Sequence, residues 1–497
     1  MRHNLSLESV QGHNHRYCDW GRRGDACAQT RCATPHQGAG EVETKTRAHT
    51  ALEEAQRCLD NIERFDGQVN AFISVLSETA LEEARAIDMT SQRGEGQGLL
   101  AGVPISVKDC IDVAGVKCTN GSRFFQDHMP HSDALVVQRL RGAGAVIVGK
   151  TNLHEFAYGS TTQNPHYGPT RNPWNLACIP SGSSGGAAAS LAAEMCVGAV
   201  GSDTGGSVRT PAAINGVCGL RPSMGAIPMT GSFTRICPAI DTVGPLGRSV
   251  DIVARMFAVM AGYDDEDLYS VRHTWDDVLS QMAGDIVGLR IGIPRRFFFE
   301  NLEPEIGEAV EQAATQLAAL GAVLTEIELD GAESAQHKVM PMVWADAYEY
   351  HRDRAEHSPE LFGQDVLDRI LLGRDISGRD YATALRVRED WNRIIDRALQ
   401  AVDVILTPTT PLAAPLITSS GDMLETTHHL TRFTYLFSWA GLPGLSVPCG
   451  FTASGLPIGM LLNGRPYDEG LLFRMGSAYQ AETNWHQRRP GLLSKGA

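Results

Sequence analysis

The sequence lacks several features that would place it in common protein classes. It contains no apolar run long enough for a transmembrane helix. The longest weakly polar stretch, residues 185–201, is mostly Gly and Ala and carries Glu194, which favours a buried helix. The first residues, MRHNLSLE, lack the apolar core of a signal peptide. We therefore expect a cytoplasmic protein with no membrane partner.

A cluster of basic residues is also missing. The 497 residues include 43 Lys and Arg against 58 Asp and Glu, which gives a formal net charge of −15. Proteins that bind nucleic acid present basic patches to the phosphate backbone. The acidic balance therefore argues against nucleic acid or an anionic membrane as the main partner, and it leaves a small-molecule substrate and a homodimer open.

Cysteine is present, but without the spacing of a metal site or a disulfide framework. The eleven cysteines form no C-x-x-C pair, which is typical of free thiols in a reducing compartment. Residues 1–40 hold four histidines and three cysteines but show no apolar periodicity. We interpret this segment as a disordered or artificial tail, with a Cys/His zinc site as the alternative, and we expect no metal and no cofactor.

From residue 41 onward, helical and strand-like patterns alternate. Apolar residues recur at helical spacing over 52–62, a helix that should end near Asp66 and Gly67, and further helices are predicted at 78–88, 134–142, 187–193, 250–260 and 305–320. Short apolar runs predict strands at 102–108, 145–149, 287–293, 322–328 and 402–407. This alternation favours an α/β fold, with one large domain over 41–497 and a central mixed, mostly parallel sheet flanked by helices.

Residues 144–151 spell the phosphate-binding pattern G-x-x-x-x-G-K-[ST]. Such a loop needs a strand before its first glycine, flexible residues between the glycines and a helix afterwards. Here the four intervening residues are apolar, so the strand should lie inside the motif, and a helix precedes it. The pattern therefore does not indicate nucleotide binding.

Residues 182–186 fit the G-x-S-x-G nucleophile elbow, with Ser184 as the nucleophile. The helix that should follow is predicted, but the preceding segment 172–180 is rich in turn residues rather than strand-like. An elbow also needs a downstream acid and histidine. The downstream histidines all lie in charged, surface-like contexts, namely His273, His337, His351, His357, His428 and His429.

A third constellation is spread over more of the chain. Lys108 ends a predicted apolar strand, where burial in the charged form would be costly, and a neutral lysine could act as a base. The alternative is a surface lysine paired with Asp109. Downstream, the loop 181–186 and the turn 203–207 are rich in Gly and Ser. Consecutive backbone N–H groups in such a turn suit a developing oxyanion, and the alternative is an ordinary glycine turn.

Taken together, these segments resemble the amidase signature family. Gly-Ser-Ser-Gly-Gly is followed by Asp-Thr-Gly-Gly-Ser, ending at Ser207, and the similarity extends over about residues 41–490. Further matching segments are 102–109, 155–164, 168–174, 216–222, 241–245 and 440–448. One departure is Ala187, where many relatives carry a serine. The resemblance implies the amidase signature fold and hydrolysis of a C–N bond other than a peptide bond.

The resemblance also implies roles for individual residues. Ser207 matches the nucleophile, Ser183 the bridging serine, which a cis peptide holds in the family, and Lys108 the base. The backbone N–H groups expected to hold the oxyanion are those of Thr204, Gly205, Gly206 and Ser207. Three residues are assigned supporting roles: Asp203 and Arg209 as a pair that fixes the turn, and Ser181 as a hydrogen-bond partner of the relay or a loop cap.

The substrate is less clearly indicated. The family cleaves amides, ureas and carbamates, and one branch is the glutamine-hydrolysing A subunit of glutamyl-tRNA amidotransferase. That branch carries an acidic residue just before a Phe-Thr pair, whereas this sequence has Arg432 in that region, which favours a stand-alone amidase. Candidates for an aromatic pocket lining, at least half of which we expect in the core, are Trp344, Tyr348, Tyr350, Tyr435, Phe437 and Trp439.

Overall fold

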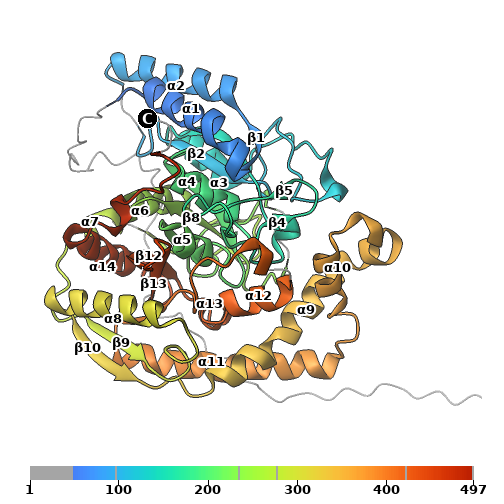
Figure 1. Ribbon diagram of the computed structural model, residues 1–497, viewed down its shortest axis with the longest axis vertical. Helices are drawn as coiled ribbons and strands as arrows, with labels where there is room; N and C mark the ends of the chain where they lie inside the picture. The colour runs from blue at the N-terminus through green and yellow to red at the C-terminus, as the bar shows by residue number, and fades with distance from the viewer. Residues whose placement is uncertain (1–48, 96–97, 233–235, 276–277, 420–421, 495–497) are drawn as a thin grey trace, which may run out of the picture. The chain divides into compact units, whose positions relative to one another are not determined.

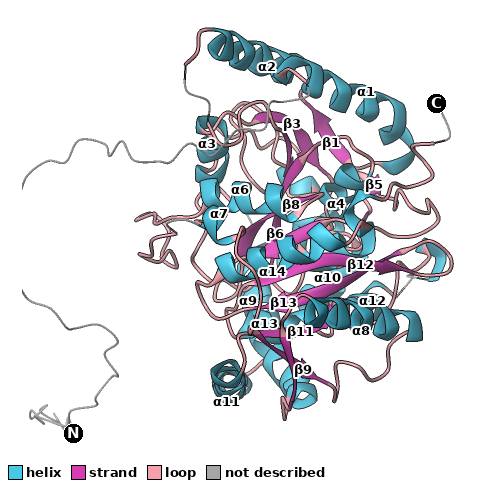
Figure 2. Cartoon of the chain, turned by 90° about the vertical axis from the view of Figure 1, so that its left-hand side faces the viewer, coloured by secondary structure: helices cyan, strands magenta, loops and turns pink. Residues whose placement is uncertain are grey.

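The structure is a computed structural model that describes residues 49–95, 98–232, 236–275, 278–419 and 422–494. The tail predicted at 1–40 lies outside these residues. The described part of the chain is built around a sheet whose strands run through the interior, with helices on both faces (Figures 1 and 2). None of the described helices is long and apolar enough to cross a membrane.

The main sheet has eleven strands in the order β1-β3-β2-β6-β8-β7-β12-β13-β11-β9-β10. A separate two-stranded sheet pairs β4 (Gln163–Asn164) with β5 (Gly168–Pro169). The strands of the main sheet are β1 (Phe72–Val75), β2 (Pro104–Lys108), β3 (Val146–Thr151), β6 (Gly198–Asp203), β7 (Cys218–Arg221), β8 (Thr242–Gly247), β9 (Arg290–Pro294), β10 (Val323–Ile327), β11 (Val404–Pro408), β12 (Gly444–Phe451) and β13 (Pro457–Asn463).

The sheet is mixed, as the sequence predicts, but it is not mostly parallel. Among the described strands, four neighbouring pairs are parallel and six are antiparallel. The connection between β12 and β13 illustrates the reason, because residues 452–456 form a tight turn that can only join antiparallel strands. Antiparallel pairing dominates the middle of the sheet, and parallel pairing is confined to its two flanks.

The described α-helices are distributed along the chain (Figure 1). They are α1 (Ala51–Val69), α2 (Ser77–Gln92), α3 (Leu135–Gly142), α4 (Gly185–Ala192), α5 (Arg209–Asn215), α6 (Val250–Met260), α7 (Val278–Gln281), α8 (Pro304–Ala319), α9 (Ala332–His357), α10 (Gln364–Leu371), α11 (Gly378–Ala401), α12 (Met423–Leu430), α13 (Thr434–Trp439) and α14 (Glu469–Glu482). All the helices and strands predicted from periodicity are confirmed, with ends shifted by a few residues.

Local chemistry explains where several of these helices begin. Thr50 caps α1 through a reciprocal pair of hydrogen bonds with Glu53, and the Ser249 hydroxyl accepts the Ile252 N–H at the start of α6. One prediction needs correction. Only the first part of the stretch 185–201 is the expected buried helix, α4, because the chain turns after Glu194 and residues 198–203 form the central strand β6.

The fold brings the conspicuous sequence motifs to one edge of the sheet. Strands β2 and β6 are parallel neighbours, and they end at Lys108 and Asp203. Because carboxyl ends of parallel strands meet at the same edge, Lys108 and the turn after Asp203 are brought together. The phosphate-loop spelling at 144–151 is instead the buried strand β3, as the sequence analysis indicates.

Candidate active site

Lys108 is fully buried at the end of β2 and contacts two serines. Its Nζ lies 2.7 Å from Ser183 Oγ and 2.8 Å from Ser202 Oγ. Burial lowers the pKa of Lys108 from its ordinary value to about 8. The alternative of a surface lysine paired with Asp109 is wrong, because Asp109 lies 2.9 Å from the Nζ of another buried lysine, Lys150.

The loop that carries Ser183 leads directly into α4. The Gly182–Ser183 peptide bond is cis, as the family resemblance implies. The Ser183 carbonyl accepts the His154 N–H at 3.2 Å, and the next residue, Ser184, donates its N–H to the carbonyl of Ser207 at 3.2 Å. A backbone hydrogen bond therefore joins the two serine-bearing loops, and the Ser183 hydroxyl contacts Lys108.

The Ser184 hydroxyl is engaged elsewhere. It donates to the Ser202 carbonyl at 3.2 Å and accepts the Ser202 N–H at 3.3 Å. These bonds tie α4 to β6 and match the interpretation of Ser184 as a loop neighbour. Ser181 does not contact the relay. Its hydroxyl donates to Thr210 Oγ1 at 3.1 Å, and so of the two roles considered for Ser181 the structure supports the one in the loop framework.

The turn 203–207 is shaped by the buried carboxylate of Asp203. This carboxylate accepts the Gly206 N–H at 2.9 Å and the Val208 N–H at 3.1 Å. The Arg209 guanidinium donates to both carboxylate oxygens, at 2.8 and 3.0 Å. Burial would raise the pKa of Asp203, but Arg209 and the neighbouring Arg221 hold it well below its usual range. Asp203 and Arg209 form the structural pair that the sequence predicts.

The same contacts change the expected set of oxyanion donors. Because the Gly206 N–H is already donated to Asp203, it is not free to hold a substrate oxygen. The N–H groups of Thr204, Gly205 and Ser207 have no acceptor within the described residues. Gly206 has a φ of +138°, a conformation that L side chains rarely adopt, so the turn requires glycine there.

Several residues that support this turn were not singled out from the sequence. The buried Asp241 accepts the Thr204 hydroxyl at 2.6 Å, and the Thr434 hydroxyl donates to the Gly205 carbonyl at 2.5 Å. Ser202 supplies the second contact of Lys108. Each had a sequence signal, because Asp241 lies in a segment that matches the family, Ser202 directly precedes the turn 203–207 and Thr434 belongs to the Phe-Thr pair after Arg432.

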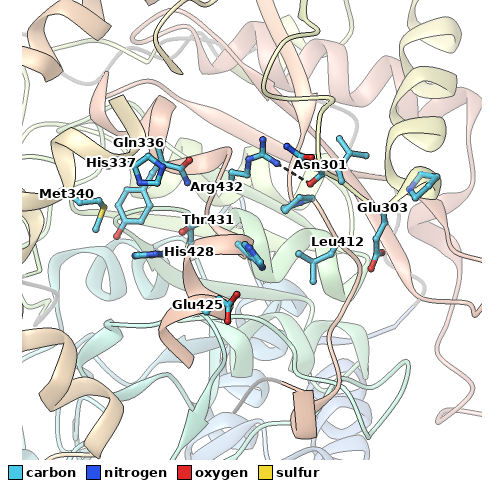
Figure 3. Close-up of a pocket in the computed structure, with 15 residues that line it drawn as sticks. Asn301, Glu303, Gln336, His337, Met340, Leu412, Glu425, His428, Thr431 and Arg432 are labelled. Atoms are coloured by element: carbon cyan, nitrogen blue, oxygen red, sulfur yellow. Dashed lines mark hydrogen bonds between the residues drawn. The ribbon is translucent and has the colours of Figure 1, made fainter. Parts of the chain in front are cut away.

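Ser207 opens onto a narrow inner pocket of about 20 Å³. Its lining includes Tyr158, Ser160, Thr204, Gly205, Ser207, Ile236, Trp344, Arg369, Leu424 and Thr427. A wider outer pocket of about 800 Å³ lies next to it (Figure 3). Four residues line both cavities, namely Met340, His428, Thr431 and Tyr435.

Two of the six aromatic candidates are buried in the core, which is fewer than the half expected from the sequence. Trp344 and Tyr435 line the inner pocket. Phe437 and Trp439 are fully buried in the core. Tyr348 donates its hydroxyl to the exposed Glu356, and the remaining candidate, Tyr350, packs edge-on against His351.

The histidines are less uniform than their sequence contexts indicate. His351 is buried against the ring of Phe156, and burial lowers its pKa to about 3. His337, His428 and His429 line the outer pocket. Burial, and then the charge of Arg369, lower the pKa of His428. No described histidine is hydrogen-bonded to Ser207 or to Ser184, so the elbow interpretation has no support.

Two pocket residues were missed altogether, Arg369 and Tyr158. The guanidinium of Arg369 is buried and donates to the carbonyls of Tyr158 and Met423 and to the Thr427 hydroxyl. Its Nε has no hydrogen-bond partner in the described chain, and neither has the buried hydroxyl of Tyr158. Their only sequence signal is Tyr158's place in the matching segment 155–164.

Arg432, the residue that distinguishes this sequence from the amidotransferase branch, holds the loop 297–301 through hydrogen bonds. It donates to the carbonyls of Phe297, Glu300 and Asn301, at 2.9, 2.8 and 3.1 Å, at the rim of the outer pocket (Figure 3). Within the described residues, no group of three or more His, Cys, Asp or Glu side chains is arranged to hold a metal ion.

Lys108, in contact with Ser183, and the glycine-rich turn of Ser207 lie at one edge of a mixed sheet flanked by helices. The family model for Amidase matches residues 53–473. The chain therefore belongs to the amidase signature family, and the resemblance found in the sequence is confirmed.

Individual relatives cover most of the chain. The A subunit of the glutamyl-tRNA(Gln) amidotransferase from Carboxydothermus hydrogenoformans is 38% identical over 480 residues, which are 91% of this chain and 99% of that protein. A solved structure of a vestigial complex described in connection with the origins of an s-triazine catabolic enzyme is 33% identical, with a TM-score of 0.82 over 87% of this chain and 95% of that one. A bacterial aryl acylamidase is 26% identical, with a TM-score of 0.82 over 90% and 96%.

Proposed function

We propose that this protein hydrolyses the C–N bond of a small amide through a covalent acyl-enzyme on Ser207. The observation that carries the proposal is the contact between Lys108 Nζ and Ser183 Oγ, 2.7 Å long and fully buried, next to the Ser207 turn. A serine hydroxyl is a weak nucleophile until a base removes its proton. Within the described site, Lys108 is the group suited to that task.

The proton relay follows from the contacts of Lys108. A neutral amine has two N–H groups and one lone pair, so Lys108 can donate to Ser202 and accept the Ser183 proton. Ser183 in turn accepts the proton of Ser207 as the Ser207 oxygen bonds to the substrate carbonyl carbon. The carbonyl electron pair moves onto its oxygen, which the N–H groups of Gly205, Ser207 and Thr204 can hold.

The relay then runs in reverse. The C–N bond breaks as the oxyanion re-forms the carbonyl, and the leaving nitrogen takes a proton from Ser183, which recovers one from Lys108. A water molecule, deprotonated along the same path, then attacks the acyl carbon. The bond between the acyl carbon and Ser207 Oγ breaks, and Ser207 recovers a proton from Lys108 through Ser183 as the acid leaves.

The inner pocket supports a substrate that carries an anionic group. Arg369 is a buried cation with no carboxylate at ion-pair distance in the described chain. Asp365, one turn earlier on the same helix, interacts with the charge of Arg369 but is paired with His154 at 2.8 Å. A buried unpaired cation is costly, and a bound carboxylate would relieve that cost. We therefore propose a small carboxylated amide as the substrate class.

The second candidate is hydrolysis of glutamine within an amidotransferase complex. The 38% identity with amidotransferase A subunits favours it, and glutamine is itself a carboxylated amide. Against it, Thr431 and Arg432 occupy the region where that branch carries its acid, and Arg432 is committed to backbone carbonyls. A stand-alone amidase is the better supported proposal.

A panel assay separates these proposals. Glutaramate, succinamate, hexanamide, an acyl anilide, a urea, a carbamate and glutamine would be offered to the purified protein, with release of ammonia or amine as the readout. We expect turnover of a carboxylated amide by the protein alone, abolished in Ser207→Ala. Ammonia release from glutamine only in the presence of partner proteins would support the amidotransferase role.

A further inference from the structure

The hydroxyl of Tyr158 is buried at the inner pocket without a protein partner. Tyr158 is 4% exposed and lines the same cavity as Ser207. Its hydroxyl has no hydrogen-bond partner in the described part of the chain. A buried hydroxyl without a partner has lost its hydrogen bonds to water, so a substrate atom that accepts from it would restore one.

The backbone before Tyr158 has an unusual conformation. Phe156 and Ala157 are both left-handed, with φ of 55° and 59°. Residues other than glycine rarely adopt such conformations, which persist where the surroundings enforce them. The Phe156 ring is held between Phe362 and His351, at centroid distances of 5.5 and 4.3 Å.

The groups around Tyr158 leave its hydroxyl available. Arg369 donates to the Tyr158 carbonyl rather than to the phenol oxygen, and its guanidinium carbon lies 5.3 Å from the centre of the ring. Burial raises the pKa of Tyr158, so the phenol keeps its proton at neutral pH and can only donate or accept as a neutral group. A substrate acceptor beside Arg369 would satisfy it.

We infer that the Tyr158 hydroxyl donates a hydrogen bond to an oxygen of the substrate carboxylate that Arg369 holds, and so selects substrates that carry this carboxylate. The inference rests on the proposed function and deepens it. A site built around a hydrogen-bond donor discriminates strongly against analogues that lack the acceptor, because the donor is then left unpaired.

The test is Tyr158→Phe, assayed on a matched pair of substrates, glutaramate and hexanamide. We expect kcat/KM for glutaramate to fall about tenfold to a hundredfold, while that for hexanamide is unchanged or rises. Because the deleted hydroxyl has no protein partner, the melting temperature should be equal or higher. Tyr479→Phe, which alters a buried tyrosine of α14, is the matched control and should leave kcat/KM unchanged for both glutaramate and hexanamide.

Three outcomes would overturn the inference: an equal loss on both substrates, a fall in melting temperature with no change in selectivity, or a wild-type preference for the neutral amide. Labelling with a fluorophosphonate distinguishes these from failure of the proposed function. If Ser207 is labelled in both wild type and Tyr158→Phe, the acyl-enzyme chemistry stands whatever Tyr158 does. If wild type is not labelled at Ser207, the proposed function itself fails.

Discussion

At the level of single residues, Lys108 must be neutral in order to accept a proton from Ser183. Burial lowers its pKa to about 8, so the fraction able to accept a proton falls as the pH drops below that value. We expect kcat/KM to decline tenfold per pH unit on the acidic side of about pH 8. The pH profiles of wild type and His428→Gln should share this limb, since a histidine-based limb would shift or vanish in the variant.

Replacement of Lys108 itself gives a second prediction. Lys108→Ala should lower amide turnover by several orders of magnitude, and turnover of esters with good leaving groups by much less, because such leaving groups need no proton from the relay. Lys108→Arg should not restore activity, since a guanidinium stays charged and cannot accept the proton. Near-normal amide turnover in Lys108→Arg, measured by steady-state kinetics, would contradict the relay.

Asp203 is expected to act through stability rather than chemistry. In Asp203→Asn, the buried guanidinium groups of Arg209 and Arg221 would lose the charge that compensates them. Breaking a buried ion pair by removing one partner typically costs about 3–5 kcal/mol. Urea denaturation should show this loss, whereas Asp251→Asn, at an exposed pair with Arg255, should cost less than about 1 kcal/mol.

At the scale of elements, α10 carries Arg369, the residue proposed to bind the anionic group of the substrate. Asp365 and Arg369 lie four residues apart, on one face of the helix. Asp365 contacts His154, and the first residue before the helix, Gly363, donates its N–H to Glu155 at 2.7 Å. These contacts tie α10 to the segment that carries Tyr158.

Loosening α10 should therefore affect binding more than chemistry. We expect Asp365→Ala to raise KM for a carboxylated amide about tenfold, about 1.4 kcal/mol, with a smaller change in kcat. Asp368→Ala is the control on the same helix, because its side chain is exposed and contacts only Gln364 among the described residues. A loss confined to kcat would mean that α10 does not position the substrate.

The sequence predicts the elements that carry strong periodicity and misses those that do not. The helix at 250–260 and the strand ending at Lys108 follow from apolar spacing and capping. Strand β6 was not predicted, because Gly198–Asp203 contains too few β-branched residues to show a strand pattern. The balance of parallel and antiparallel pairs depends on which distant strands meet, and this information is not local.

The same distinction applies to the site. Lys108, Ser183 and Ser207 could be selected because they lie in long ordered motifs, and the structure places Lys108 against Ser183. Arg369 and Tyr158 are separated by 211 residues in the chain and meet only in the folded pocket. The Gly206 N–H is unavailable to a substrate because it donates to the Asp203 carboxylate, and the spacing of these residues in the sequence does not reveal that hydrogen bond.

At the scale of the whole molecule, the candidate catalytic machinery lies within the described body. The family match covers residues 53–473, so the first 40 residues lie outside it. Removal of residues 1–40 should leave the melting temperature and kcat/KM unchanged within error, as measured by thermal unfolding and the panel assay. A large loss of either would mean that this segment binds the body or a metal.

The central claim is that Ser207 is the nucleophile and that Lys108 activates it through Ser183. The most direct measurement is the rate of covalent labelling by a fluorophosphonate, mapped by peptide mass spectrometry over a range of pH. The account predicts a single adduct on Ser207, with a rate that falls below about pH 8 and is strongly reduced in Lys108→Ala and Lys108→Arg. An adduct on Ser184, or a labelling rate in Lys108→Arg equal to wild type, would contradict it.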